Sequence, residues 1–191
     1  INVIRKIESL QFPSAMPNMR FPIENMYHGS RIAPKGVTHV HHFFFSRAAQ
    51  SMAFLWEKAK NEKDHRIRQM LLFFVDQAIS GLSILNRYIP TQFNKFGGSQ
   101  VNRQLTGVYY ISSMVSECSP SYNLAKKLDR LTKVFAAYSP NSGDVAITLG
   151  SAANIEGLQS SSVDYIFTDP PFGENIFYAD LNFLVEAWHG V

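Results

Sequence analysis

The stretch VDYIFTDPPFGENIFY, Val163 to Tyr178, decides how this chain is interpreted. The residues before Asp169 are rich in β-forming side chains and predict a buried strand. An aspartate and two prolines follow, although Asp is costly inside a core and Pro cannot extend a sheet ladder. Because ligands bind beyond the carboxyl ends of strands in open parallel sheets, this position indicates a functional loop.

The loop from Asp169 to Phe172 offers two acceptors and an aromatic face. Pro170 and Pro171 fix φ and stiffen the turn while keeping their carbonyls as acceptors. The Asp169 carboxylate and the Pro170 carbonyl can accept both hydrogens of an exocyclic amine whose ring stacks on Phe172. This favours a more tetrahedral nitrogen, whose lone pair can attack a methyl donor. The alternative is a plain tight turn in which Asp169 caps the next segment.

A longer stretch, SVDYIFTDPPFGENIFYADLNFLVEAW, resembles the catalytic segment of amino-methylating DNA methyltransferases, whose signature is Asp/Asn/Ser-Pro-Pro-Tyr/Phe/Trp. The stretches GVTHVHHFFFSRAAQSMAFLWE, LNRYIPTQFN and GVYYISSMVSECSPSYNLAKKLDRL are similar to the central part of large bacterial site-specific DNA methylases. The resemblance is loose up to about residue 140 and close from Asp144 onward. It implies methyl transfer from S-adenosylmethionine to adenine N6 or cytosine N4 of a base swung out of the duplex.

Carried over residue by residue, the resemblance implies that Asp169 and Pro170 orient the amine, with Pro171 completing the motif, and that Phe172 stacks on the base. Asp at position 169, where Ser also occurs, favours adenine N6. The implied protein is a cytoplasmic, DNA-binding enzyme of the restriction-modification kind. The alternatives are an RNA guanine or adenine amine methyltransferase, a methylase of small molecules or protein amides, and a non-catalytic DNA-binding module.

The methyl-donor site departs from the family pattern. The family binds S-adenosylmethionine with a glycine-rich loop of the kind Asp-Pro-Phe-x-Gly-x-Gly, and nothing in this sequence matches it. The family often carries Gly-Asp-Ala before the catalytic strand, where this chain has Gly150 and Ser151 followed by alanine. These two residues are therefore the candidate donor-binding residues, although Ser151 lacks the charge. We expect the main donor-binding element in the remainder of a longer parent chain, and this portion alone could be inactive.

The charge distribution indicates a polyanionic partner, which under the resemblance is DNA. Residues 1–140 hold all 18 Lys and Arg against 8 acids, whereas residues 141–191 hold 7 acids and no Lys or Arg. A basic portion joined to an acidic one suits a polyanion held beside a carboxylate site. The candidate phosphate-binding residues lie mainly on one face of an expected helix, and they are Lys126, Lys127, Arg130 and Lys133. A solvated helix face explains them equally well.

The 191 residues divide into three expected segments. Residues 1–43 hold four prolines and two glycines, which predicts an irregular arm laid over a surface. Residues 44–103 predict helices, one of them running from Ile67 to Leu85, and then a polar loop. In residues 104–191, LTGVYYISSMV, DVAITLG and SVDYIFTDPPF read as strands that alternate with helices. The expected fold is therefore α/β, an incomplete Rossmann-like methyltransferase core of parallel sheet and flanking helices, with an added helical segment.

The composition excludes several other classes of protein. A content of 46% hydrophobic and 17% charged residues predicts an ordered globular fold. The single cysteine, Cys118, excludes an internal disulfide and favours a reducing compartment. No apolar run approaches the roughly 18 residues that a membrane span requires. The histidines at 39, 41 and 42 have no Cys or acid beside them, so no metal site is expected.

Overall fold

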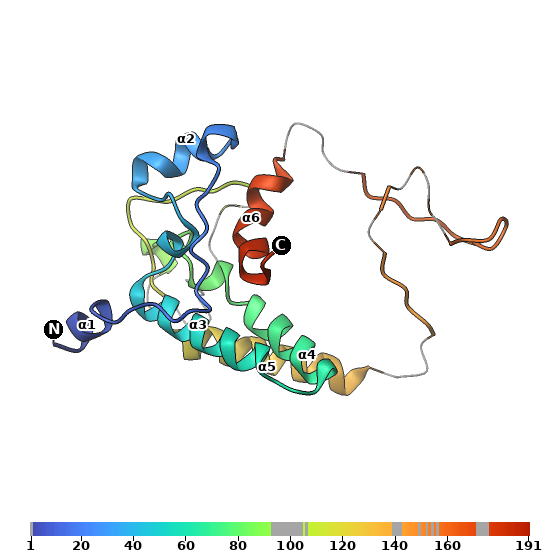
Figure 1. Cartoon of the computed structure of the whole chain (residues 1–191), viewed down its shortest axis with the longest axis horizontal. Coiled ribbons are helices and arrows are strands. Elements are labelled where there is room, and N and C mark those ends of the chain that lie inside the picture. Colours follow the sequence, from blue (N-terminus) through green and yellow to red (C-terminus); the bar gives the residue numbers. More distant parts are fainter. Residues whose placement is uncertain are drawn as a thin grey trace.

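The chain was analysed as a computed structural model, which describes residues 2–92, 105, 107–138, 143–148, 150–151, 153, 155, 157–170 and 176–191. Within these residues every regular element is a helix (Figure 1). Pairing between extended segments is limited there to three isolated bridges, Arg20–His39, Phe44–Ser83 and Arg87–Val115. The predicted Rossmann-like parallel sheet is therefore wrong for the part of the chain that the structure describes.

The physical reason is that a strand needs a neighbour. The runs 143–148 and 163–168, predicted as strands, pair with no other described segment. Without a ladder, their β-forming side chains cannot by themselves define a sheet, because strand preference reflects packing against neighbouring strands. The run expected over 105–115 contributes only the single bridge of Val115 among its described residues.

The helices follow one another along the chain with short connections in its first half. They are α1 (Asn2–Glu8), η1 (Ile23–Asn25), α2 (Gly29–Ile32), η2 (Ala33–Lys35), η3 (Val40–Phe43), α3 (Ser46–Lys60), α4 (His65–Asp76), η4 (Ser80–Leu82), η5 (Pro90–Gln92), α5 (Pro120–Ala137) and α6 (Tyr178–His189). The long elements α3, α4 and α5 lie against one another (Figure 1).

The ends of the long helices have local causes. The Asp64 side chain caps α4 by accepting a hydrogen bond from the backbone N of Ile67 at 2.9 Å. Proline at position 120 suits the first turn of α5, where its missing N–H is not needed. Helix α6 ends at Gly190, whose φ of +78° is the left-handed conformation that terminates many helices.

The core joins the first half of the chain to its last helix. Trp188 of α6 packs against Trp56 of α3, with ring centroids 5.4 Å apart, and meets Phe44 edge-on at 5.7 Å. Three apolar residues from the first 43 positions, Phe21, Ile32 and Val40, are also fully buried. The proline-containing N-terminal segment therefore contributes to the core, and α6 is held in place by contacts made more than 130 residues away in sequence.

The segment from residue 143 to residue 170 leaves the helical body (Figure 1). Every residue described within it is exposed. Ile147 is 92% exposed and Phe167 is 80% exposed. The run before Asp169, expected as a buried strand, is thus extended and uncovered. Such a row of large apolar side chains in water is unusual for a folded protein.

Candidate functional site: an exposed loop and the buried anchor of the following helix

The predicted catalytic loop begins on the exposed segment. Asp169 and Pro170 are both exposed, and Asp169 makes no hydrogen bond or ion pair with the part of the chain that the structure describes. Pro171 and Phe172 lie outside the described residues. The carboxylate is therefore not used to stabilise the described scaffold, and its oxygens are open to a ligand.

The candidate donor-binding residues form no cradle. Gly150 and Ser151 are exposed, and the Ser151 hydroxyl accepts a hydrogen bond from the backbone N of Ala153 at 3.2 Å. This is the geometry of a local turn, which occupies the hydroxyl within the backbone. As the structure describes them, these two residues form no site for S-adenosylmethionine by themselves.

The four candidate phosphate-binding residues all lie on α5, but they differ in their surroundings. Lys133 pairs with Asp129 at 2.8 Å, and Lys126 donates to the Tyr122 hydroxyl at 2.5 Å. Lys127 is half-buried, and burial, followed by the neighbouring Arg130 charge, lowers the pKa of its ammonium group.

Arg130 itself is exposed. The four residues therefore share one helix, but Lys126 and Lys133 are already bound to side chains four positions earlier on it.

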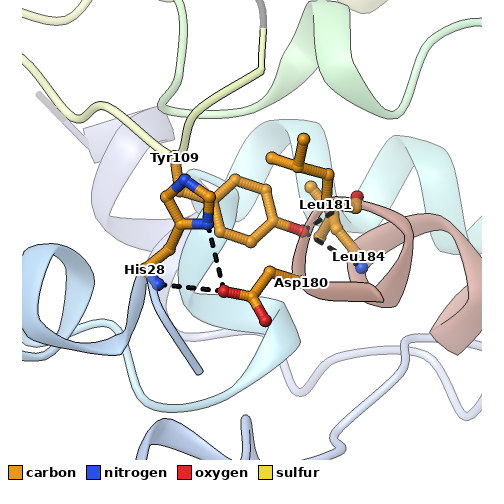
Figure 2. A network of polar contacts seen from close by, with 5 residues as sticks. All are labelled: His28, Tyr109, Asp180, Leu181 and Leu184. Atoms are coloured by element: carbon orange, nitrogen blue, oxygen red, sulfur yellow. Dashed lines mark hydrogen bonds and ion pairs between the residues drawn. The ribbon is translucent and has the colours of Figure 1, made fainter. Parts of the chain in front are cut away.

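A buried polar network anchors the helix that follows the loop (Figure 2). One oxygen of Asp180, Oδ2, accepts a hydrogen bond from the backbone N of His28 at 2.9 Å and lies 3.1 Å from His28 Nδ1. Asp180 is only 9% exposed and His28 is fully buried. In the tautomer with its proton on Nδ1, the imidazole donates a second hydrogen bond to this oxygen. The first turn of α6 is thereby joined to the residue that precedes α2.

Tyr109 joins the same helix from a third part of the chain (Figure 2). Its hydroxyl donates to the Leu181 carbonyl at 3.1 Å and accepts from the backbone N of Leu184 at 3.3 Å. Burial raises the pKa of the Tyr109 phenol well above its usual range, so it acts as a neutral donor. The Tyr109 hydroxyl thereby bonds to both the first and the second turn of α6, through the carbonyl of its fourth residue and the N–H of its seventh.

Aromatic contacts extend this anchor to the residue before α6. Phe177, the residue before α6, stacks on Tyr27 with ring centroids 3.9 Å apart and an interplanar angle of 9°. The backbone of Gly29 lies so close to Ile23 that a Cβ at position 29 would sit 2.1 Å from the Ile23 carbonyl oxygen. Only glycine permits this approach, which sets the path of the chain beside His28.

Sequence reasoning missed the anchor of α6. His28 and Tyr109 carry no motif and no helical or strand periodicity, and Asp180 lies 152 residues from His28 in sequence. Only the folded chain brings them together. The available signal was Asp180 itself. An acid in the first turn of the apolar helix α6 is expected to bind a partner when it is buried.

Three other histidines lie close together before α3. His39, His41 and His42 have ring centroids within 5.6 Å of one another, and burial, then the charges of the other two histidines, lowers the pKa of His41. In the described ranges, no group of three His, Cys, Asp or Glu side chains is placed to hold a metal ion. Of the helices that the structure describes, none has the length and apolarity needed to cross a membrane.

No protein-family model, curated protein or solved structure matches this chain. The likeness to amino-methylating DNA methyltransferases therefore depends on residues of the chain itself, chiefly those from Asp169 to Phe172.

Replacing Asp180 with alanine tests the anchor. The substitution leaves the buried backbone N–H of His28 without its acceptor, so we expect a loss of about 1–3 kcal/mol in the free energy of unfolding. Asp180→Asn is the matched control, because the amide oxygen can still accept that hydrogen bond, and it should lose less. Urea titration followed by circular dichroism measures both variants. Equal stability of Asp180→Ala and the unmodified chain would show that the network contributes nothing.

Proposed function

We propose that this chain carries the amine-binding loop of a methyltransferase that acts on an exocyclic amine of a flipped DNA base, with adenine N6 as the favoured atom. The observation that carries the proposal is the exposed pair of acceptors, the Asp169 carboxylate and the Pro170 carbonyl, at the end of an apolar run.

The proposed role of the loop is to hold the amine by its two hydrogens. An aromatic amine is a weak nucleophile because its lone pair is delocalised into the ring. Acceptors fixed at both N–H bonds stabilise the nitrogen as it loses that delocalisation, which is a transition-state interaction. The rigid Pro170 keeps its carbonyl in one place without further ordering during the reaction. S-adenosylmethionine, bound by other residues, would supply the methyl group.

A nucleic acid is favoured as the substrate by charge, and DNA by the resemblance. The first 140 residues have a net charge of +10, from 18 basic residues and 8 acids. Nucleic-acid affinity is dominated by neutralisation of phosphates, so an excess of this size supports a polyanionic substrate. Base flipping costs a few kcal/mol, which such contacts can supply. The same charge would suit RNA, whose amines are the alternative substrate.

A second body is required to complete the site. Val163, Tyr165, Ile166 and Phe167 are all exposed directly before the loop. Burying apolar side chains of this size stabilises a protein by about 1.5–3 kcal/mol each, so leaving four of them in water forgoes a large contribution. We propose that further residues of a longer parent chain cover this run and hold the methyl donor, and that the protein acts in the cytoplasm, where Cys118 stays reduced.

Tritium transfer from methyl-labelled S-adenosylmethionine tests the function. The protein, expressed at the natural length of its gene product, is incubated separately with duplex DNA, RNA and a protein mixture. We expect label in DNA, and digestion of that DNA to nucleosides should give N6-methyladenine. Label confined to RNA would reassign the substrate. Absence of transfer to all three, with salt-sensitive DNA binding retained, would contradict the enzyme and favour a binding module.

A further inference from the structure

A column of one cation and two aromatic rings lies beside the N-terminal end of α6. The guanidinium carbon of Arg31 lies 5.4 Å from the centroid of the Tyr27 ring, and Phe177 stacks on Tyr27 at 3.9 Å. Arg31 is exposed and Tyr27 is 52% exposed, so the column is accessible from solvent. An arginine held over an aromatic face keeps the N–H groups on the edge of its guanidinium free for a second partner.

The guanidinium of Arg31 has no carboxylate partner among the described residues. The ion pairs formed there by arginine join Arg20 to Glu24 and Arg47 to Glu117. Glu24, the acid nearest to Arg31 in sequence, is already engaged by both terminal nitrogens of Arg20. An oriented and unpaired guanidinium suits an oxyanion, and phosphate matches its forked geometry.

The column is held in one position by the anchor of α6. His28 follows Tyr27 directly, and its ring lies edge-on to both Tyr27 and Phe177, with centroids 5.3 and 6.1 Å away. The two contacts of Asp180 with His28 then fix this histidine to the first turn of α6. A cation on such a platform loses less conformational freedom when it binds a ligand than a lysine on a mobile stem would.

The position of the column relates it to the proposed reaction. Phe177 follows Pro170 by seven residues, so the two are at most about 25 Å apart along an extended chain. Each strand of duplex DNA carries one phosphate for about every 3.4 Å of its axis, so a strand that presents a base to the loop has several phosphates within a span of that length.

We propose that Arg31, supported by Tyr27 and Phe177, binds a backbone phosphate of the nucleic acid whose base enters the Asp169–Phe172 loop. This inference rests on the proposed function, which supplies the nucleic-acid substrate. It assigns a phosphate contact to the N-terminal segment, outside the basic residues of α5. This contact would fix the position of the strand relative to the loop, because phosphate contacts position a strand and do not read its sequence.

The test is DNA affinity as a function of salt, measured by fluorescence anisotropy with a short labelled duplex. We expect Arg31→Ala to weaken binding about tenfold and to reduce the slope of log K against log salt by about one ion. Arg31→Lys keeps the charge but lacks the forked N–H groups of the guanidinium. Its DNA affinity should lie between those of the unmodified chain and Arg31→Ala. Tyr27→Ala keeps the cation but removes its platform, and should weaken binding by a smaller factor.

The matched control is Arg66→Ala, which removes one exposed arginine from α4. Thermal melts by circular dichroism confirm that each variant is folded. Equal affinity and salt slope in the Arg31 and Arg66 variants, with DNA binding by the unmodified chain intact, would overturn this inference and leave the proposed function standing. If the unmodified chain binds neither DNA nor RNA, both fail. Binding of RNA alone, weakened in Arg31→Ala, would support the phosphate contact and overturn the DNA substrate.

Discussion

Replacement of Trp188 with alanine is expected to lower the free energy of unfolding by about 3–5 kcal/mol, the largest stability effect we foresee for a single substitution in this chain. Trp188 is only 1% exposed and packs on Trp56 and Phe44. The truncation removes the indole and leaves a cavity that the surrounding helices can fill only in part. Since small domains have about 5–15 kcal/mol in total, this loss removes a large part of the stability and should move the unfolding midpoint to a much lower denaturant concentration.

Guanidinium titration followed by circular dichroism at helical wavelengths measures this loss. Tyr165→Ala is the control, because it removes another large aromatic ring from a side chain that is 79% exposed on the segment outside the helical body. The control should change stability by less than about 0.5 kcal/mol. A Trp188→Ala protein as stable as the control would mean that α6 does not belong to the core.

Helices were predictable from the sequence because their signal is local. The apolar residues of α3, α5 and α6 recur at helical spacing, and the structure confirms a helix at each of these places. The predicted helix from Ile67 to Leu85 ends earlier, at Asp76. Gly81 lies within the remaining stretch and adopts a short 3-10 turn, and its carbonyl accepts a hydrogen bond from the side chain of Asn86 at 2.6 Å. Glycine weakens a helix interior, so the long periodic pattern did not hold through this point.

Strands were not predictable, because they depend on distant partners. The pattern of Val163 to Phe167 shows only that these side chains suit a strand that is covered on both faces. Whether a ladder forms depends on other segments, and the described residues supply none. The same limit applies to the anchor of α6, whose members are far apart in sequence. The role of the loop as a pair of acceptors stays a prediction, although its chemistry is contained within four consecutive residues.

The Asp169→Ala variant should lose methyl transfer by about 10²–10³-fold in kcat/KM, the largest effect on activity that we expect. This estimate takes the loss of one acceptor from the amine to be comparable to removal of one hydrogen-bonding group from an oxyanion hole. Stability should not change, because Asp169 is exposed and makes no contact with the described residues. The loss should fall on kcat, since the acceptor acts on the amine as it becomes tetrahedral and binds the ground state more weakly.

Two further variants separate this role from a general effect of charge. Asp169→Asn keeps one acceptor oxygen at the same place and should retain more activity than the alanine variant. Asp164→Ala removes an exposed acid from the same extended segment, five residues earlier, and should transfer methyl groups at nearly the normal rate. Tritium incorporation into duplex DNA at saturating and at low DNA concentrations measures kcat and kcat/KM for each variant. Near-normal turnover in Asp169→Ala would remove the carboxylate from the reaction.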